Sequence, residues 1–169
     1  AIRQHYSPSG PNDQCPKEPV SIAIALADKL DTLVGFWIIN KKPTSSSDPY
    51  GLRRSALGVV RIILENEIDL GINELLERSV NLYLSQGLHA DSDKIVESTR
   101  KFIFDRLKIF IKSQGISHDL IAASLKIEFD DKLLRFLNRI ISLKSFLSQD
   151  IGIDLLKAYR RANNIVSIE

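Results

Sequence analysis

The sequence of 169 residues contains no methionine, one cysteine and one tryptophan. A natural chain begins with methionine unless it is processed, so we expect this chain to be a piece of a longer protein. Cys15 has no second cysteine with which to form an internal disulfide, and a single thiol cannot build a zinc site. The cysteine content therefore predicts a cytoplasmic protein.

Long apolar runs and an excess of charge are also missing. No run approaches the roughly 20 apolar residues of a membrane span, and prolines near the start replace an apolar signal core, so we expect no membrane association. The net charge is only +2, which is not typical of a strongly basic nucleic-acid-binding protein. Any RNA binding is therefore expected to be local or to depend on further parts of the protein.

What the sequence does contain is helical periodicity. Hydrophobic residues make up 44% of the chain, enough for a core in one domain or two small ones. No segment alternates as a strand does, and no Asn-Gly or Asp-Gly hairpin signal occurs. The fold class predicted is all-α, a multi-helix bundle with a mild internal boundary near residues 87–91. The expected helices cover about 22–38, 49–68, 72–86, 92–115, 117–125, 129–146 and 150–166.

The stretch from Ile22 to Arg61 is predicted to organise the chain as helix, polar loop and helix. Asp48 and Pro49 are a strong start signal for the second helix, because Asp caps free N–H groups and Pro fits the first helical position. Each helix carries one apolar stripe, with Asp28 and Asp31 on another face of the first. The stripes contain Leu26, Leu30, Leu33, Val34 and Trp37, then Leu52, Ala56, Val59, Val60 and Ile63, with Arg53, Arg54 and Arg61 off the second stripe.

Arg53 and Arg54 lie within one turn of a helix N-terminus, where the helix dipole disfavours cations, so a specific partner is expected. If the two helices are antiparallel, Asp31 lies nearly level with Arg54, and Asp28 is about one turn deeper. We therefore predict at least one partly buried structural ion pair between these helices, formed among Asp28, Asp31, Arg53 and Arg54. Contact of the two arginines with RNA phosphate is the alternative.

Several motifs resemble one known family. They are ALADKLDTLVGFW, KPTSSSDPYGLRRSALGVVRII, the upstream AIRQHYSP and, more weakly, RFLNRIISLKSF and AYRRANNIVS. Together they resemble the beta subunit of the two-subunit (alpha2 beta2) bacterial glycyl-tRNA synthetase. The chain departs from the family pattern at Ser45 and Ser47, where Gly and Lys are usual, and at Gly51, where Ala is usual. A loop function that needs those residues is not expected here.

The resemblance implies a fragment from the C-terminal half of that subunit. Residues 1–88 would be the C-terminal part of an HD-like helical domain, and residues 89–169 the first part of a DALR-type anticodon-binding domain. It further implies a ligase that joins glycine to tRNA(Gly) using ATP and Mg, with its catalytic site on the alpha subunit, tRNA handled by the beta subunit, and a heterotetrameric assembly. No nucleotide-binding motif occurs in this chain, so we expect no catalytic residue, no cofactor and no metal site in it.

The candidate tRNA-binding residues are basic residues that recur along the later helices. Solvated helix faces carry such charge routinely, so spacing alone does not decide between the two interpretations. Two other functions stay open, a degenerate HD-type phosphohydrolase with a metal ion at Asp28 and a purely structural helical adaptor. His118-Asp119 lies too far downstream to complete that metal site. The tRNA candidates are Lys101, Lys108, Lys112, Arg135, Arg139, Lys157, Arg160 and Arg161.

Overall fold

The computed structural model describes residues 4–10, 12–125 and 131–166, and its regular elements are all helices. The only β-type pairing in this described part is an isolated bridge between Gly71 and Lys132. The all-α prediction is thus confirmed. None of the described helices has the length and apolar character that a membrane span requires. The helices are α1 (Pro19–Ile38), α2 (Leu52–Glu65), α3 (Ile72–Ser85), α4 (Ser92–Ser113), α5 (His118–Leu125), α6 (Leu133–Leu147) and α7 (Asp150–Val166).

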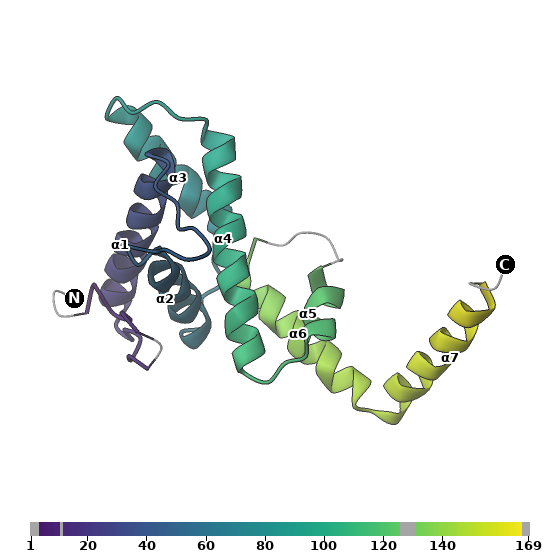
Figure 1. Ribbon diagram of the computed structural model, residues 1–169. Helices are drawn as coiled ribbons and strands as arrows, with labels where there is room; N and C mark the ends of the chain where they lie inside the picture. The colour runs from purple at the N-terminus through teal and green to yellow at the C-terminus, as the bar shows by residue number, and fades with distance from the viewer. Residues whose placement is uncertain (1–3, 11, 126–130, 167–169) are drawn as a thin grey trace.

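Helices α1 to α4 form a bundle around one apolar core (Figure 1). The long helix α4 packs against α1, α2 and α3, and the first turns of α6 reach α2 and α4. The two predicted stripes contribute to this core, because apolar residues at helical spacing lie on one face of each helix. Fully buried residues of the core include Leu33 and Val34 of α1, Ile62 and Ile63 of α2, Leu76 and Val80 of α3, Ile103 and Leu107 of α4, and Leu133 and Ile140 of α6.

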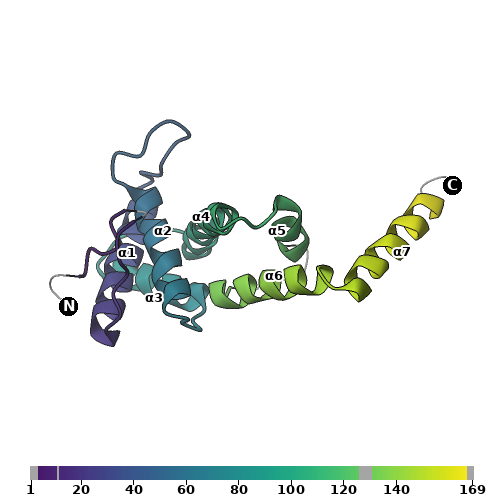
Figure 2. The same cartoon turned by 90° about the horizontal axis from the view of Figure 1, so that it is seen from below.

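The C-terminal helices extend away from this bundle. α5 packs against α6 beside the lower end of α4, and α7 projects outward and packs against the end of α6 (Figures 1 and 2). The predicted boundary near residue 88 falls in the turn between α3 and α4, and α4 packs on the helices that precede that turn. The division into residues 1–88 and 89–169 stays a prediction.

The start of α2 differs from the prediction. The helix begins at Leu52 rather than Pro49, and Gly51 precedes it in the left-handed conformation with φ of 64°. Asp48 still caps the helix, because its carboxylate accepts hydrogen bonds from the backbone N–H of Leu52 at 2.8 Å and of Arg53 at 2.9 Å. The cap therefore acts across a turn, and Gly51 supplies the positive φ that this turn requires. The loop between α1 and α2 stands away from the bundle (Figure 2).

Arg61 was predicted to lie off the apolar stripe of α2, and the structure corrects this. Only 8% of the surface of Arg61 is exposed to solvent. The guanidinium donates to the carbonyl oxygen of Gly10 at 2.8 Å and of Asp13 at 2.6 Å, and its Nε donates to Glu65 at 2.7 Å. Because these carbonyls belong to the segment before α1, Arg61 fastens that segment to α2.

Cys15 lies in the same segment and is buried against the core. Burial, with further contributions from the neighbouring Glu65, raises the pKa of its thiol from 9.0 to about 12. Only the thiolate reacts with disulfide reagents. At a fixed pH near 8, the thiolate fraction falls about tenfold for each unit by which the pKa of the thiol rises. We expect Cys15 to react with a chromogenic disulfide at least a hundredfold more slowly in the folded chain than in urea. Comparable rates in the two conditions would contradict this.

Candidate functional site

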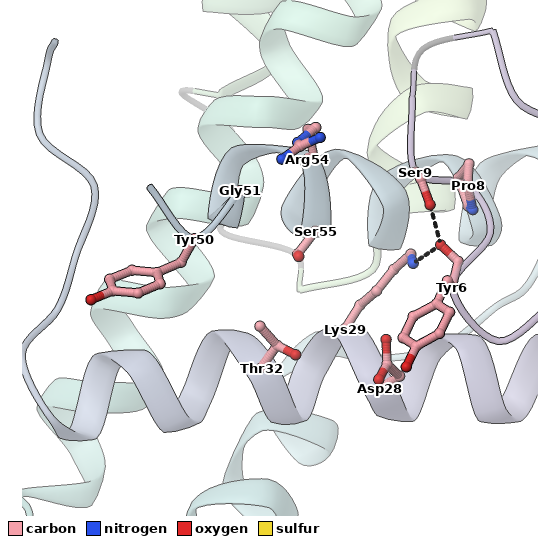
Figure 3. A pocket seen from close by; sticks show the side chains of 10 residues that line it. All are labelled: Tyr6, Pro8, Ser9, Asp28, Lys29, Thr32, Tyr50, Gly51, Arg54 and Ser55. Carbon is pink, nitrogen blue, oxygen red and sulfur yellow. Dashed lines mark hydrogen bonds between the residues drawn. The ribbon is translucent and has the colours of Figure 1, made fainter. Parts of the chain in front are cut away.

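A polar cavity of about 350 Å³ lies where α1, the start of α2 and the N-terminal segment meet (Figure 3). The N-terminal segment contributes Tyr6, Pro8 and Ser9. Helix α1 contributes Asp28, Lys29 and Thr32, and the start of α2 contributes Tyr50, Gly51, Arg54 and Ser55. The helical pattern explains the α1 set, because Asp28 and Thr32 are four residues apart and therefore share a face.

Lys29 is the buried cation of this cavity, with 5% of its surface exposed. Its ammonium donates to the carbonyl oxygen of Tyr6 at 3.0 Å, and the Ser9 hydroxyl donates to the same oxygen at 2.9 Å (Figure 3). Burial lowers the pKa of Lys29, while the adjacent Asp28 acts in the opposite direction. The side chain can lie there because Gly58 of α2 leaves the space; a Cβ at Gly58 would be 2.5 Å from Lys29 Cε.

The predicted ion pairs between α1 and α2 are not formed. Among the ion pairs of the described residues, none joins Asp28 or Asp31 to Arg53 or Arg54. Arg53 instead donates to the carbonyl oxygen of Thr44 in the α1–α2 loop. Arg54 is exposed and lies back over Gly51, where a Cβ would meet its Nη2 at 2.8 Å. A lysine from α1, not an aspartate, occupies the space facing α2.

Asp28 also lines a second cavity, an apolar groove of about 690 Å³ between α1 and α3. His5 and Asp31 border this groove, and the backbone carbonyl of Asp31 accepts a hydrogen bond from the Tyr83 hydroxyl at 3.3 Å. Burial raises the pKa of Tyr83 to about 12, and Asp31 adds to the effect. In the part of the chain that the structure describes, no three His, Cys, Asp or Glu residues come together as metal ligands would.

Comparison with known proteins identifies the family. The family model described as glycyl-tRNA synthetase beta subunit matches residues 1–126 of the chain. The chain belongs to the glycyl-tRNA synthetase beta subunit family. It is 45% identical over 167 residues to the glycine–tRNA ligase beta subunit of Ruegeria sp. (strain TM1040), covering 99% of this chain and 23% of that relative.

Two further beta subunits agree with this assignment. That of Rhodospirillum centenum is 44% identical over 170 residues, covering 100% of this chain and 23% of the relative. That of Cereibacter sphaeroides (strain ATCC 17029 / ATH 2.4.9) is 43% identical over 167 residues, covering 99% and 24%. The chain thus spans about a quarter of the length of the curated relatives that it matches.

In this member of the glycyl-tRNA synthetase beta subunit family, the tRNA candidates spread over three helices. Lys101 and Lys112 of α4 are exposed. Lys108 of α4 pairs with Asp105 at 2.9 Å, and Lys157 of α7 pairs with Asp154 at 3.0 Å. Arg135 and Arg139 of α6 both have interaction partners. Arg160 and Arg161 are exposed on α7. The structure therefore does not gather the candidates into one cluster, and their role in tRNA binding stays a prediction.

Lys29 and Arg61 are buried cations whose roles sequence reasoning missed. Both carried a detectable signal. Lys29 lies four residues after Ala25 and four before Leu33, which are fully buried positions of α1. Arg61 lies between Val60 and Ile62 in an apolar run. A cation at a buried position of an apolar stripe indicates that a carbonyl or carboxylate group binds it, because an unpaired buried charge is costly.

Proposed function

We propose that this chain contributes to tRNA recognition and subunit architecture in a glycine–tRNA ligase, a cytoplasmic enzyme. ATP- and Mg-dependent attachment of glycine to tRNA(Gly) would take place on the alpha subunit of an alpha2 beta2 assembly. The observation that carries the proposal is similarity to glycine–tRNA ligase beta subunits over 99–100% of the chain. The relatives' name implies a second, alpha, subunit and a tRNA substrate.

The exposed apolar surface of α7 supports the architectural part of this proposal. Gly152 is the only buried residue of the helix within its described range. Ile151 is 67% exposed, Tyr159 65% and Ile165 69%. A helix of 17 residues with apolar side chains left in water is typical of a surface that packs against other protein.

The exposed cations of α7 support the tRNA part, and they provide its test. Lys and Arg release counterions when they neutralise phosphates, so affinity for tRNA(Gly) is expected to fall about tenfold or more between roughly 50 and 200 mM salt. The double variant Arg160→Gln/Arg161→Gln should weaken binding and lower the salt slope by about one to two. Filter binding or fluorescence anisotropy of the 169-residue chain measures both quantities.

The matched control for this test is Arg78→Gln. Arg78 of α3 has a side chain that is 74% exposed and pairs with Glu74, and it belongs to none of the later helices. Its loss should leave the affinity and the salt slope unchanged. An affinity that ignores salt, or an equal loss in the control and the α7 variant, would count against this surface.

A further inference from the structure

Several hydrogen-bond donors that line the polar cavity at the start of α2 have no acceptor among the described residues. Lys29 offers three N–H donors, and the structure assigns one of them to Tyr6. The hydroxyls of Thr32 and Ser55 also line the cavity, and neither is hydrogen-bonded to another group of the described residues. Arg54 adds a guanidinium at the rim that joins no ion pair in the described part of the chain.

The charges of the lining favour an anion. Lys29 and Arg54 contribute two positive charges and Asp28 one negative charge. The volume of about 350 Å³ lies at the lower end of the range of roughly 300–1,000 Å³ for small-molecule sites.

We propose that this cavity binds the phosphate group of a nucleotide or of an RNA end. A phosphate offers several acceptor oxygens, which suit an ammonium, a guanidinium and two hydroxyls together. Lys29 supplies a buried charge, and Arg54 supplies a second charge at the rim, where its guanidinium lies over Gly51. Thr32 and Ser55 supply neutral donors from opposite walls (Figure 3). The half-exposed ring of Tyr50, stacked on Phe36 with ring centroids 4.3 Å apart, lies at the same cavity and offers a surface for a base.

This site is separate from the tRNA surface proposed above, because it uses no residue of α4, α6 or α7. Its test is a nuclear magnetic resonance titration of the 169-residue chain with adenosine 5′-monophosphate, with adenosine as the probe that lacks phosphate. We expect saturable shifts of the backbone amides of Ser9, Thr32 and Ser55 with the nucleotide and none with adenosine. Equal shifts with adenosine, or no saturable shift at these amides, would overturn the proposal.

Variants then assign the contacts. Arg54→Gln changes an exposed side chain, so folding is preserved, and it should weaken nucleotide binding about tenfold because one charge-assisted contact is lost. Arg78→Gln, on the far side of α1, should leave the affinity unchanged. Asp28→Asn removes the opposing negative charge and should tighten binding. An unchanged affinity in Arg54→Gln, or weaker binding in Asp28→Asn, would contradict the assignment.

A pair of short RNAs distinguishes the two sources of phosphate. One carries a 5′-phosphate and the other a 5′-hydroxyl, with the same sequence. Tighter binding of the phosphorylated RNA than of the nucleotide, with shifts at the same three amides, assigns the site to an RNA end. Tighter binding of the nucleotide assigns it to a free nucleotide. These outcomes do not depend on Arg160 or Arg161, so failure of either proposal leaves the other testable.

Discussion

Replacing Arg61 with alanine is expected to lower the free energy of unfolding by about 3 kcal/mol, because the buried guanidinium makes three charge-assisted hydrogen bonds. The substitution leaves the carbonyl oxygens of Gly10 and Asp13 without this donor. Urea denaturation followed by the fluorescence of Trp37, which is 3% exposed, measures the change. The same data report whether unfolding stays cooperative.

The control for Arg61 is Arg78→Ala. Arg78 also forms an ion pair with a glutamate four residues away, at the same 2.7 Å, but its side chain is 74% exposed. Exposed pairs of this kind contribute about 0–1 kcal/mol, so Arg78→Ala should change stability by less than 1 kcal/mol. Equal effects of the two substitutions would show that burial of Arg61 does not matter.

Cys15 supplies a second measurement on the Arg61 variant. The thiol lies in the segment that Arg61 fastens to α2, between the bonded Asp13 and the start of α1. If Arg61→Ala releases this segment, the thiol should become reactive under conditions in which the remaining helices stay folded. A protected thiol in a destabilised variant would mean that Arg61 supports the bundle as a whole rather than the segment.

Apolar periodicity was sufficient to predict the helices, because burial of one face of each helix is a property of spacing alone. The stripe from Leu26 to Trp37 is buried as expected. The start of α2 was displaced by three residues because Asp48 caps it through a turn at Gly51 rather than from the adjacent position. Such a turn depends on local backbone geometry, which the pair Asp48-Pro49 does not specify.

The polar contacts could not be predicted in the same way. Asp28 and Asp31 were the predicted partners of Arg53, but Arg53 donates to the backbone carbonyl of Thr44. Lys29 and Arg61 also donate to backbone carbonyls. Every residue carries a carbonyl, so sequence cannot indicate which of them a loop leaves without a partner. Charge complementarity between side chains therefore predicted the wrong partner for Arg53, and it predicted an ion pair for Arg54 that is not formed among the described residues.

Lys29 fits tightly against Gly58 of α2. Gly58→Ala should destabilise the chain by about 1–2 kcal/mol, because the new methyl group would lie 2.5 Å from Lys29 Cε in a buried space. In the variant Lys29→Ala that obstacle is gone, and the nearest remaining contact is the Pro8 carbonyl at 3.4 Å. There, Gly58→Ala should instead stabilise the chain by up to about 1 kcal/mol, since alanine is the better helix former.

The expected effect of Gly58→Ala on stability reverses when Lys29 is replaced, so a double-mutant cycle tests whether the two residues are in contact. The four proteins, compared by urea denaturation, should give a coupling energy of about 2 kcal/mol between positions 29 and 58. Each single variant serves as the control for the other, because the helix-propensity gain is the same in both backgrounds and cancels in the cycle. Equal effects of Gly58→Ala with and without the lysine would mean that Lys29 does not fill the space against α2. The cavity would then be held open by another contact, and the buried ammonium at its wall would have to be placed elsewhere.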